Sequence, residues 1–378
     1  MIIRALTYTI DISKCIADSY VSDCIEKISE ILKDIEQNAI VRTVRLNSEV
    51  ITVNEFLQLG LVLEQLQNSL LNSRVRWLCV GIQISKLDYG NFKELEKTII
   101  SFLDKFPFLF INVTHSDDCR INDNGLLGVA SIIRNIAVRS GSGYNNFRFG
   151  YFSRAIYGIP FFPFSIGEHE YDYSVAVEVT QQYVSRLNSV KSHDNIDLFT
   201  SEDTKTLREI QESASDSFKG FDFSFAPYPE ENISVGEIYG TFDQFRNFGG
   251  HGSVKTTSTL TRKIRDYANG NKLKMSGFNG VMLSVLEDKV LSELMVADKF
   301  QLSDLYLNST VCGCGIDMFP VSGFKTEFEI ALMLSDLDEL AFRLEKPLGF
   351  RILPITGRVV GDFTDFSMQY ICNSQIKV

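Results

Sequence analysis

The sequence contains no long apolar run and no long block of charges of one sign. Apolar stretches such as residues 75–82 and 106–113 are far shorter than the ~18 residues that a membrane span requires. The first residues carry one basic side chain and reach Asp11 before an apolar segment of signal-peptide length has formed. We therefore expect a cytoplasmic protein with no membrane partner.

Cysteine is also sparse. The seven cysteines are an odd number scattered along a large chain, which is unlike a dense disulfide framework. This pattern predicts reduced thiols, as the cytosol maintains them. The residues concerned are Cys15, Cys24, Cys79, Cys119, Cys312, Cys314 and Cys372.

No nucleotide-binding motif is present. Residues 249–253 read Gly-Gly-His-Gly-Ser ahead of an expected helix, and their backbone amides could hold an anion. The Lys-Ser/Thr ending of a P-loop and the glycine spacing of a dinucleotide fingerprint are both absent. We favour an ordinary flexible turn here. The cofactor stays unknown, with a divalent metal ion as an open alternative.

Acidic residues outnumber basic ones by 48 to 37, which gives a net charge of −11. A polyanion is repelled by such an average field, so nucleic acid is not expected as a partner. Hydrophobic residues make up 44% of the chain and charged residues 22%, which suffices for a buried core. Because no clear linker or internal repeat divides the chain, we expect a single domain over residues 1–378.

Strand and helix patterns alternate along the first part of the chain. β-branched segments predict strands at residues 2–8, 40–46, 75–83 and 108–114, each followed by an amphipathic helix pattern. Parallel neighbours need crossover connections, so this order predicts an α/β fold with a mainly parallel sheet. Further strands are expected at residues 147–152, 173–179, 221–227, 280–286 and 349–354.

The most unusual local sequence is Val-Cys-Gly-Cys-Gly-Ile-Asp at residues 311–317. Cys312 and Cys314 flank one glycine, but a structural zinc site needs four ligands and no second cysteine pair exists. We favour small buried thiols beside glycines that permit close packing. In the functional alternative, the segment is a loop at a barrel mouth with Asp317 as a polar site group.

Acidic residues and a histidine are concentrated at residues 167–172, which read Gly-Glu-His-Glu-Tyr-Asp. His169 could act as an acid or base or bind a metal ion, because imidazole titrates near neutrality. The alternative, which we favour, is a solvated charged turn.

Carboxylates also follow predicted strands. Asp222 and the pair Glu287 and Asp288 lie near the expected carboxyl ends, where α/β sheets bind their ligands. Asp288 is equally suited to be the N-cap of the helix that follows.

Residues 356–366 partly resemble the loop that carries the radical glycine in glycyl radical enzymes. In those enzymes an aromatic residue follows the glycine, whereas Asp362 follows Gly361 here. We favour a glycine-permitted turn. A radical mechanism would instead place Gly361 against Cys312 or Cys314.

Six segments in order resemble one family, domain of unknown function 711, also called uncharacterised protein family 0210. They span most of the chain, and the Cys-Gly segment is the most diagnostic of them. The family usually has threonine where Cys314 stands and Pro-Gly-Asp at residues 322–324. The segments are residues 146–150, 158–163, 221–229, 277–288, 311–317 and 361–366.

The resemblance implies a fold similar to the α/β barrel of pyruvate formate-lyase and ribonucleotide reductase, with about ten strands and surrounding helices. In that barrel a loop enters from inside, and residues 312–317 are the candidate for it. The resemblance implies no reaction.

Our leading hypothesis is an enzyme that acts on a small polar metabolite in an enclosed barrel cavity, by acid/base or metal-assisted rather than radical chemistry. The alternative is a non-catalytic protein that binds a small molecule or a metal ion. Two titratable groups about 3–6 Å from a common point would favour catalysis. A homodimer is expected from base rates alone. The catalytic candidates are Asp222, Glu287, Asp288, Asp317 and Cys312, and the substrate-binding candidates are Arg148, His169, Glu178, Gly313 and Gly315.

Overall fold

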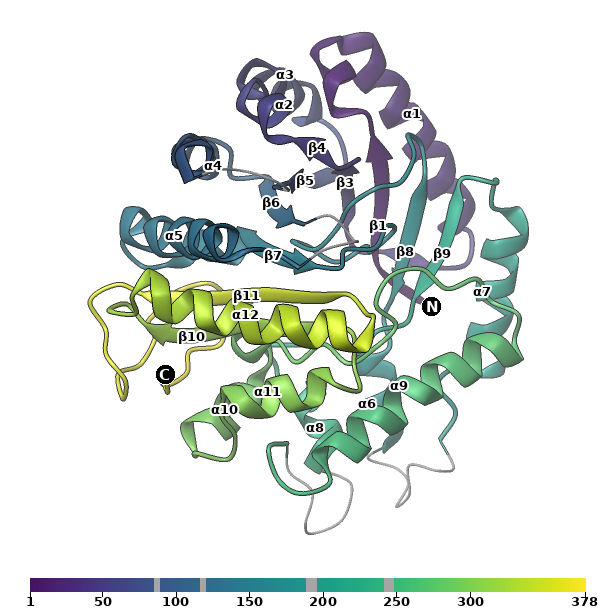
Figure 1. Cartoon of the computed structure of the whole chain (residues 1–378). Helices are drawn as coiled ribbons and strands as arrows, with labels where there is room; N and C mark the ends of the chain where they lie inside the picture. Colours follow the sequence, from purple (N-terminus) through teal and green to yellow (C-terminus); the bar gives the residue numbers. More distant parts are fainter. Residues whose placement is uncertain (85–88, 116–119, 188–195, 241–247) are drawn as a thin grey trace.

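Eleven strands form one sheet with helices around it in the computed structural model, which describes residues 1–84, 89–115, 120–187, 196–240 and 248–378 (Figure 1). The α/β class is therefore confirmed. Cys119 lies outside the described residues. The strands are β1 (Ile2–Ile10), β2 (Ile40–Val41), β3 (Val44–Ser48), β4 (Ile51–Thr52), β5 (Val75–Gln83), β6 (Leu109–Thr114), β7 (Phe149–Ser153), β8 (Tyr173–Val177), β9 (Phe218–Asp222), β10 (Gly315–Ser322) and β11 (Leu348–Ile355).

The helices lie at the periphery of Figure 1 and the strands lie inside them. Among the described residues, none of the helices combines the length and the apolarity that a bilayer crossing needs. The helices are α1 (Asp18–Ile35), α2 (Val53–Leu57), α3 (Gly60–Leu70), α4 (Tyr89–Lys105), α5 (Asp123–Ser140), α6 (Thr180–Leu187), α7 (Ser201–Ser213), α8 (Val235–Gly240), α9 (Ser253–Gly270), α10 (Lys289–Val296), α11 (Leu302–Ser309) and α12 (Glu327–Leu344).

The sheet consists of a central block of parallel strands and a pair of parallel strands on each side of it. Each flanking pair runs antiparallel to the central block. Its order is β10-β11-β7-β6-β5-β3-β1-β8-β9, with β2 paired to β1 and β4 to β5. Strands β1, β3, β5, β6 and β7 run parallel to one another. The pairs β1·β8 and β7·β11 are antiparallel, while β8·β9 and β10·β11 are parallel. One end of the sheet therefore carries the amino ends of the first block and the carboxyl ends of the flanking strands.

The segment between β9 and β10 departs from the predicted regular structure. Residues 280–286 were expected to be a strand, and this prediction is wrong. Val281 and Ser284 form only isolated bridges, to Phe225 and to Asp317 of β10, and a 3-10 turn follows at Val285–Glu287. Met275 adds a further isolated bridge, to Phe221 of β9. The same segment thus contacts both end strands of the sheet.

The Cys-Gly segment was predicted to be a loop up to Asp317, but strand β10 begins at Gly315. All residues of β10 are buried, so the apolar run from Ile316 to Val321 forms a core strand. A different loop, at residues 158–166, packs against one face of the sheet.

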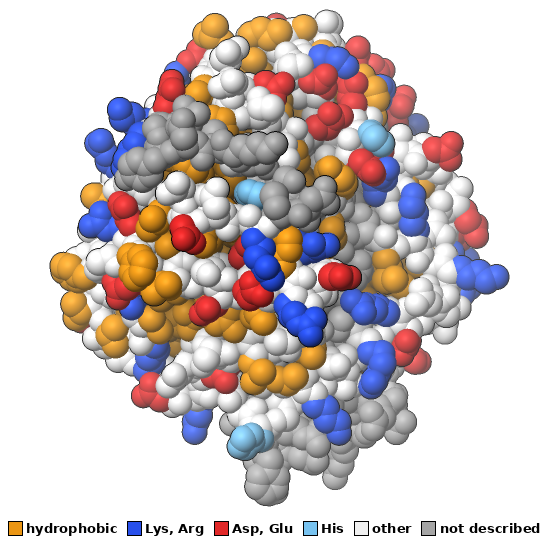
Figure 2. Space-filling model, viewed as in Figure 1, with side chains coloured by type: hydrophobic (Ala, Val, Ile, Leu, Met, Phe, Trp, Pro, Cys, Tyr) orange, Lys and Arg blue, Asp and Glu red, His pale blue; other side chains and the backbone are white. Residues whose placement is uncertain are grey.

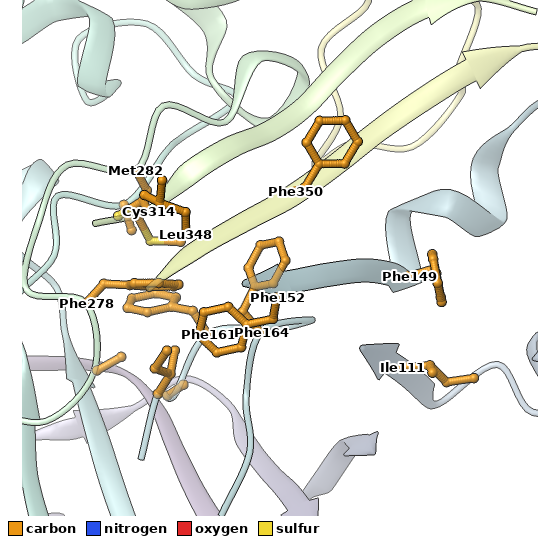
Figure 3. Packing of buried hydrophobic residues seen from close by; sticks show 14 of the residues in the cluster. Ile111, Phe149, Phe152, Phe161, Phe164, Phe278, Met282, Cys314, Leu348 and Phe350 are labelled. Carbon is orange, nitrogen blue, oxygen red and sulfur yellow. The ribbon is translucent and has the colours of Figure 1, made fainter. Parts of the chain in front are cut away.

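The loop at residues 158–166 is held by side chains of the sheet. Asn112 donates hydrogen bonds to the Pro163 carbonyl at 2.7 Å and to the Ser165 carbonyl at 3.3 Å, and Asn47 donates to Ser165 Oγ at 2.9 Å. Phe164 fills the space above Gly150 and Gly349, where an added Cβ would lie 2.6 Å from its ring. Figure 3 shows Phe161 and Phe164 of this loop among the buried aromatic rings. These contacts fix the loop as an inner layer of the core.

Charges are mixed on the face of the molecule drawn in Figure 2. Blue and red side chains are interspersed there, with small hydrophobic groups between them. That face carries no continuous surface of one charge sign.

Candidate functional site

The cavity that we consider the candidate site lies at the amino ends of β1, β3, β5 and β6 and has a volume of about 480 Å³. It combines aromatic walls with several arginines, and we call it the arginine-aromatic cavity. Its lining residues are Arg4, Thr43, Arg45, Trp77, Pro107, Phe110, Tyr144, Phe147, Arg148, Phe161, Phe162, Ala226, Pro227, Met282, Glu287, Arg351 and Tyr370.

The topology explains why these residues meet. The sequence-based expectation placed the site at the carboxyl ends of strands, which is true of only one side of this cavity. Ala226 and Pro227 follow β9, whereas Arg4, Arg45 and Trp77 lie near the amino ends of β1, β3 and β5. Because β8 and β9 run antiparallel to the first block, both kinds of strand end meet at this end of the sheet.

Aromatic rings form a continuous wall of the cavity. The ring centroid of Phe110 lies 5.7 Å from that of Trp77, 5.6 Å from that of Phe147 and 5.4 Å from that of Phe162. Tyr370 continues the wall at 5.6 Å from Phe147. Such edge-to-face and tilted contacts are the arrangements that the ring quadrupole favours. The wall presents flat apolar surfaces to a ligand.

Arg351 of β11 holds two carboxylates at the cavity. Its Nε and Nη2 atoms donate to both oxygens of Asp317, at 2.5 and 2.9 Å, and Nη2 also donates to Glu287 at 2.7 Å. Burial opposes the charge on this guanidinium, but the two carboxylates outweigh it, so the pKa of Arg351 is raised. Asp317 therefore neutralises the buried guanidinium group of Arg351 and does not itself line the cavity.

Glu287 is the one predicted catalytic residue among the cavity-lining residues. Its Oε2 atom accepts hydrogen bonds from Arg351 at 2.7 Å and from Ser284 Oγ at 2.6 Å. No described residue donates to its Oε1 atom. About a quarter of the side chain is exposed, at 23%. This carboxylate can accept a hydrogen bond from a ligand.

Two further arginines reach the cavity from β1 and β3. Arg4 is the extra residue at the irregular register between Ile3 and Ala5 in the β1·β8 pairing, and such bulges re-aim a side chain. Its guanidinium donates to Glu178 at 3.2 Å and to the Pro227 carbonyl at 2.8 Å. Arg45 donates through Nη1 to the Pro160 carbonyl at 3.2 Å and lies 5.2 Å from the Phe162 ring centroid.

Glu178 was predicted to bind substrate, but it is fully buried and faces protein groups. Tyr228 donates to it at 2.6 Å, and Arg4 and Arg42 lie 3.2 and 3.4 Å away. Glu178 is thus a positioning residue for Arg4 rather than a lining residue.

Asp222 was predicted to be catalytic, and the structure gives it a structural role. It is fully buried and accepts hydrogen bonds from Ser224 N and Oγ, Phe278 N and Asn279 N, at 2.5–3.2 Å. Burial raises its pKa to about 6, against the lowering effect of these donors. The carboxylate fastens the turn at residues 277–279 to the end of β9.

Asp288 is the N-cap of α10, as the alternative interpretation predicted. It accepts a hydrogen bond from Leu291 N at 3.1 Å and others from Val235 N at 2.6 Å, Gly236 N at 3.2 Å and Tyr228 N at 3.4 Å. Burial raises its pKa to about 6. All of its contacts are to backbone amides of the protein.

Cys312 and Cys314 are buried, as the packing interpretation predicted, and neither lines the arginine-aromatic cavity. Their sulfur atoms are 3.7 Å apart, and the Cys312 thiol lies between the amide and carbonyl of Val281, at 3.0 and 3.1 Å. The hydrogen bond between the two thiols lowers the pKa of Cys312 to about 6, while burial raises the pKa of Cys314. In Figure 3, Cys314 is labelled beside Met282 and Leu348 of the apolar cluster.

The remaining predicted site residues have other roles or positions. Arg148 reaches the cavity wall, but it donates to the backbone carbonyls of Phe106 at 2.9 Å and Leu103 at 2.5 Å. His169 is exposed and lies outside the lining residues. Gly315 has a φ of +88°, and an added Cβ would lie 2.0 Å from the Gly349 carbonyl oxygen. Gly313 does not line the cavity either.

Gly361 is exposed, with a φ of +99°, and no atom lies within 4 Å of an added Cβ there. The buried thiols of Cys312 and Cys314 are therefore not placed against it, so the geometry favours the turn interpretation. Among the described residues, no group of three or more His, Cys, Asp or Glu side chains is arranged to hold a metal ion.

The sequence analysis named Arg148 but missed the other arginines and the aromatic residues that line the cavity. One signal was available. Arg351 interrupts an otherwise apolar strand segment, and a buried arginine needs a partner or a ligand.

A family model described as "Uncharacterised ACR (DUF711)" matches residues 1–367. The chain belongs to the DUF711 family. This confirms the family that the six sequence segments indicated. The DUF711 match covers every residue of the cavity except Tyr370.

Curated relatives of the DUF711 chain carry the name UPF0210 protein. One from Sulfurisphaera tokodaii is 32% identical over 148 residues, 39% of this chain and 33% of the relative. Another from Pyrobaculum arsenaticum is 28% identical over 163 residues, 43% of this chain and 36% of the relative. A third, from Oenococcus oeni, is 28% identical over 145 residues, 38% of this chain and 32% of the relative. The chain thus matches about a third of the length of these relatives, and their names describe no activity.

Proposed function

We propose that the protein binds a small organic molecule with a flat apolar body in the arginine-aromatic cavity. The observation that carries this proposal is the aromatic wall itself, in which Trp77, Phe110 and Phe147 line a space of about 480 Å³. Ligand pockets for small molecules have volumes of about 300–1,000 Å³ and apolar walls with a few placed polar groups. Glu287 and the arginines supply those polar groups.

The proposal includes closure of the sheet into a barrel around the inner loop at residues 158–166. The isolated bridges from Met275 and Val281 toward β9, and from Ser284 to β10, support it because one segment links the two end strands. The resemblance to the pyruvate formate-lyase barrel, which implies about ten strands with surrounding helices, also supports it. In such a barrel the cavity is the open mouth at one end.

Trp77 is the single tryptophan of the chain and lines the cavity, so its fluorescence reports on occupancy. The experiment titrates the protein with a panel of small aromatic compounds and follows Trp77 emission together with the melting temperature. We expect a saturable change with a subset of the panel, weakened several-fold by Tyr370→Ala. Tyr370 is 41% exposed, so this change should cost little stability.

Tyr157→Ala is the matched control, because Tyr157 is 47% exposed and does not line the cavity. It should leave the titration unchanged. The proposal fails if no compound gives a saturable signal, or if both tyrosine variants weaken binding equally.

A second candidate function is catalysis on the bound molecule, with Glu287 as the acid or base. The observation that favours it is that Glu287 lines the cavity and that no described residue donates to its Oε1 atom. Glu287 is the only carboxylate among the predicted catalytic residues that lines the cavity. Binding without catalysis is therefore the better supported function. Turnover of a bound compound that Glu287→Gln abolishes, with binding retained, would reverse this order.

A further inference from the structure

The arginine-aromatic cavity has an excess of positive charge, although the chain as a whole carries −11. Among the lining residues and their ion-pair partners are four guanidinium groups and three carboxylates. The guanidinium groups are those of Arg4, Arg45, Arg148 and Arg351, and the carboxylates are those of Glu178, Glu287 and Asp317. A cavity of this composition attracts an anion.

The excess is located at Arg45. Arg4 pairs with Glu178, and Arg351 pairs with Asp317 and Glu287. Arg148 has no carboxylate partner, but backbone carbonyls occupy its Nη atoms. Arg45 forms no ion pair within the described ranges, and its one hydrogen bond goes from Nη1 to the Pro160 carbonyl.

One edge of the Arg45 guanidinium is unused. Its Nε atom is buried without a hydrogen-bond partner, and no described residue accepts from Nη2. In Arg351 the same edge, Nε with Nη2, holds both oxygens of Asp317. Burial, and secondly the charge of Arg4, lowers the pKa of Arg45 to about 10, against the opposing charge of Glu287, so the side chain remains charged near neutral pH without an ion-pair partner among the described residues.

We propose that the ligand of this cavity carries a carboxylate that pairs with the Nε and Nη2 edge of Arg45, while its flat apolar body lies against the aromatic wall. A carboxylate matches this edge because two parallel hydrogen bonds fit its two oxygens. The inference rests on the proposed function, and it identifies the ligand as an aromatic or similarly planar organic carboxylate.

Glu287 does not oppose this assignment, because Arg351 pairs with it at 2.7 Å and neutralises its charge. Its Oε1 atom instead suits a hydrogen-bond donor on the far end of the ligand. A planar carboxylate with a hydroxyl group opposite the acid combines both features.

The experiment compares 4-hydroxybenzoate with 4-hydroxybenzamide, two probes that share the ring and differ in charge. Calorimetry measures both affinities for the wild type, for Arg45→Met and for Arg76→Met. Arg76 is the matched control, because it lies on β5 with its side chain exposed and outside the cavity. We expect the wild type and Arg76→Met to bind the acid at least about tenfold more tightly than the amide. Arg45→Met should lose this preference and keep its affinity for the amide.

The outcomes separate this inference from the proposed function. Equal binding of both probes by the wild type would overturn the carboxylate assignment and leave the aromatic binding site intact. Preference for the acid that persists in Arg45→Met would also overturn it. If neither these probes nor the aromatic panel bind, the proposed function fails as well. The melting temperature of Arg45→Met verifies its fold, which we expect to persist because the variant breaks no ion pair.

Discussion

At Arg351 a single guanidinium group serves three acceptors, namely Asp317, Glu287 and the backbone carbonyl of Phe147 at 2.9 Å. Asp317 is bound in bidentate fashion and is 3% exposed. Removing one member of a buried pair leaves an uncompensated charge, which costs more than losing both. The stability of this part of the molecule therefore depends on the pair as a unit.

We expect Arg351→Met to lower the free energy of unfolding by about 3–5 kcal/mol, because Asp317 is left buried and ionised. The double variant Arg351→Met with Asp317→Asn should cost less than the sum of the two single changes. Urea denaturation of all four proteins measures this coupling energy. Additive effects would show that the pair is not coupled.

At the scale of the element, helix α12 begins with a reciprocal capping box. Thr326 Oγ1 accepts from Glu329 N at 3.2 Å, while Thr326 N donates to Glu329 Oε2 at 2.8 Å. The backbone hydrogen bond from Thr326 is the main cause that lowers the pKa of Glu329 to about 2. The beginning of α12 therefore depends on two residues that are three positions apart in the sequence.

Thr326→Ala should lower the free energy of unfolding by about 1 kcal/mol, because an amide at the start of α12 loses its acceptor. Thr326→Ser is the control and should retain most of the stability, since it keeps the hydroxyl group. Thermal denaturation of the three proteins gives the comparison. An unchanged melting temperature in Thr326→Ala would contradict the role of the cap.

At the scale of the whole molecule, two buried carboxylates give stability a particular dependence on pH. Burial raises the pKa of Asp222 and of Asp288 to about 6, whereas an unfolded aspartate titrates near ~3.9. Between these values the folded state binds more protons than the unfolded state. These two groups therefore contribute stability that increases as the pH falls from about 6 to about 4.

We expect Asp222→Asn and Asp288→Asn each to reduce this rise by on the order of 2 kcal/mol, because asparagine does not titrate. Chemical denaturation at a series of pH values between about 4 and 7 measures it. Asp216→Asn is the control, since Asp216 is exposed. If the aspartate variants kept the full pH dependence of the wild type, the titration would have to be assigned elsewhere.

Local sequence patterns correctly predicted the α/β class, most strands of the first parallel block of the sheet and the position of Asp288 as a helix cap. They failed at residues 280–286, where an apolar run predicted a strand that forms only isolated bridges. They also failed at the beginning of β10, because Gly315 to Asp317 were predicted to belong to a loop. A homodimer, a cytoplasmic location and the absence of a nucleic-acid partner stay predictions.

The sequence by itself determined the secondary structure that depends on near neighbours, together with the family to which the chain belongs. Only the tertiary structure decided which polar residues meet, because strand order and direction are set by long-range pairing. Arg4, Arg45, Glu287 and Arg351 are far apart in sequence, and the antiparallel junctions at β8 and β11 bring them to one cavity. The tertiary structure also decided the burial that gives Asp222 and Asp317 structural roles, because a local sequence pattern does not show which groups will enclose a carboxylate.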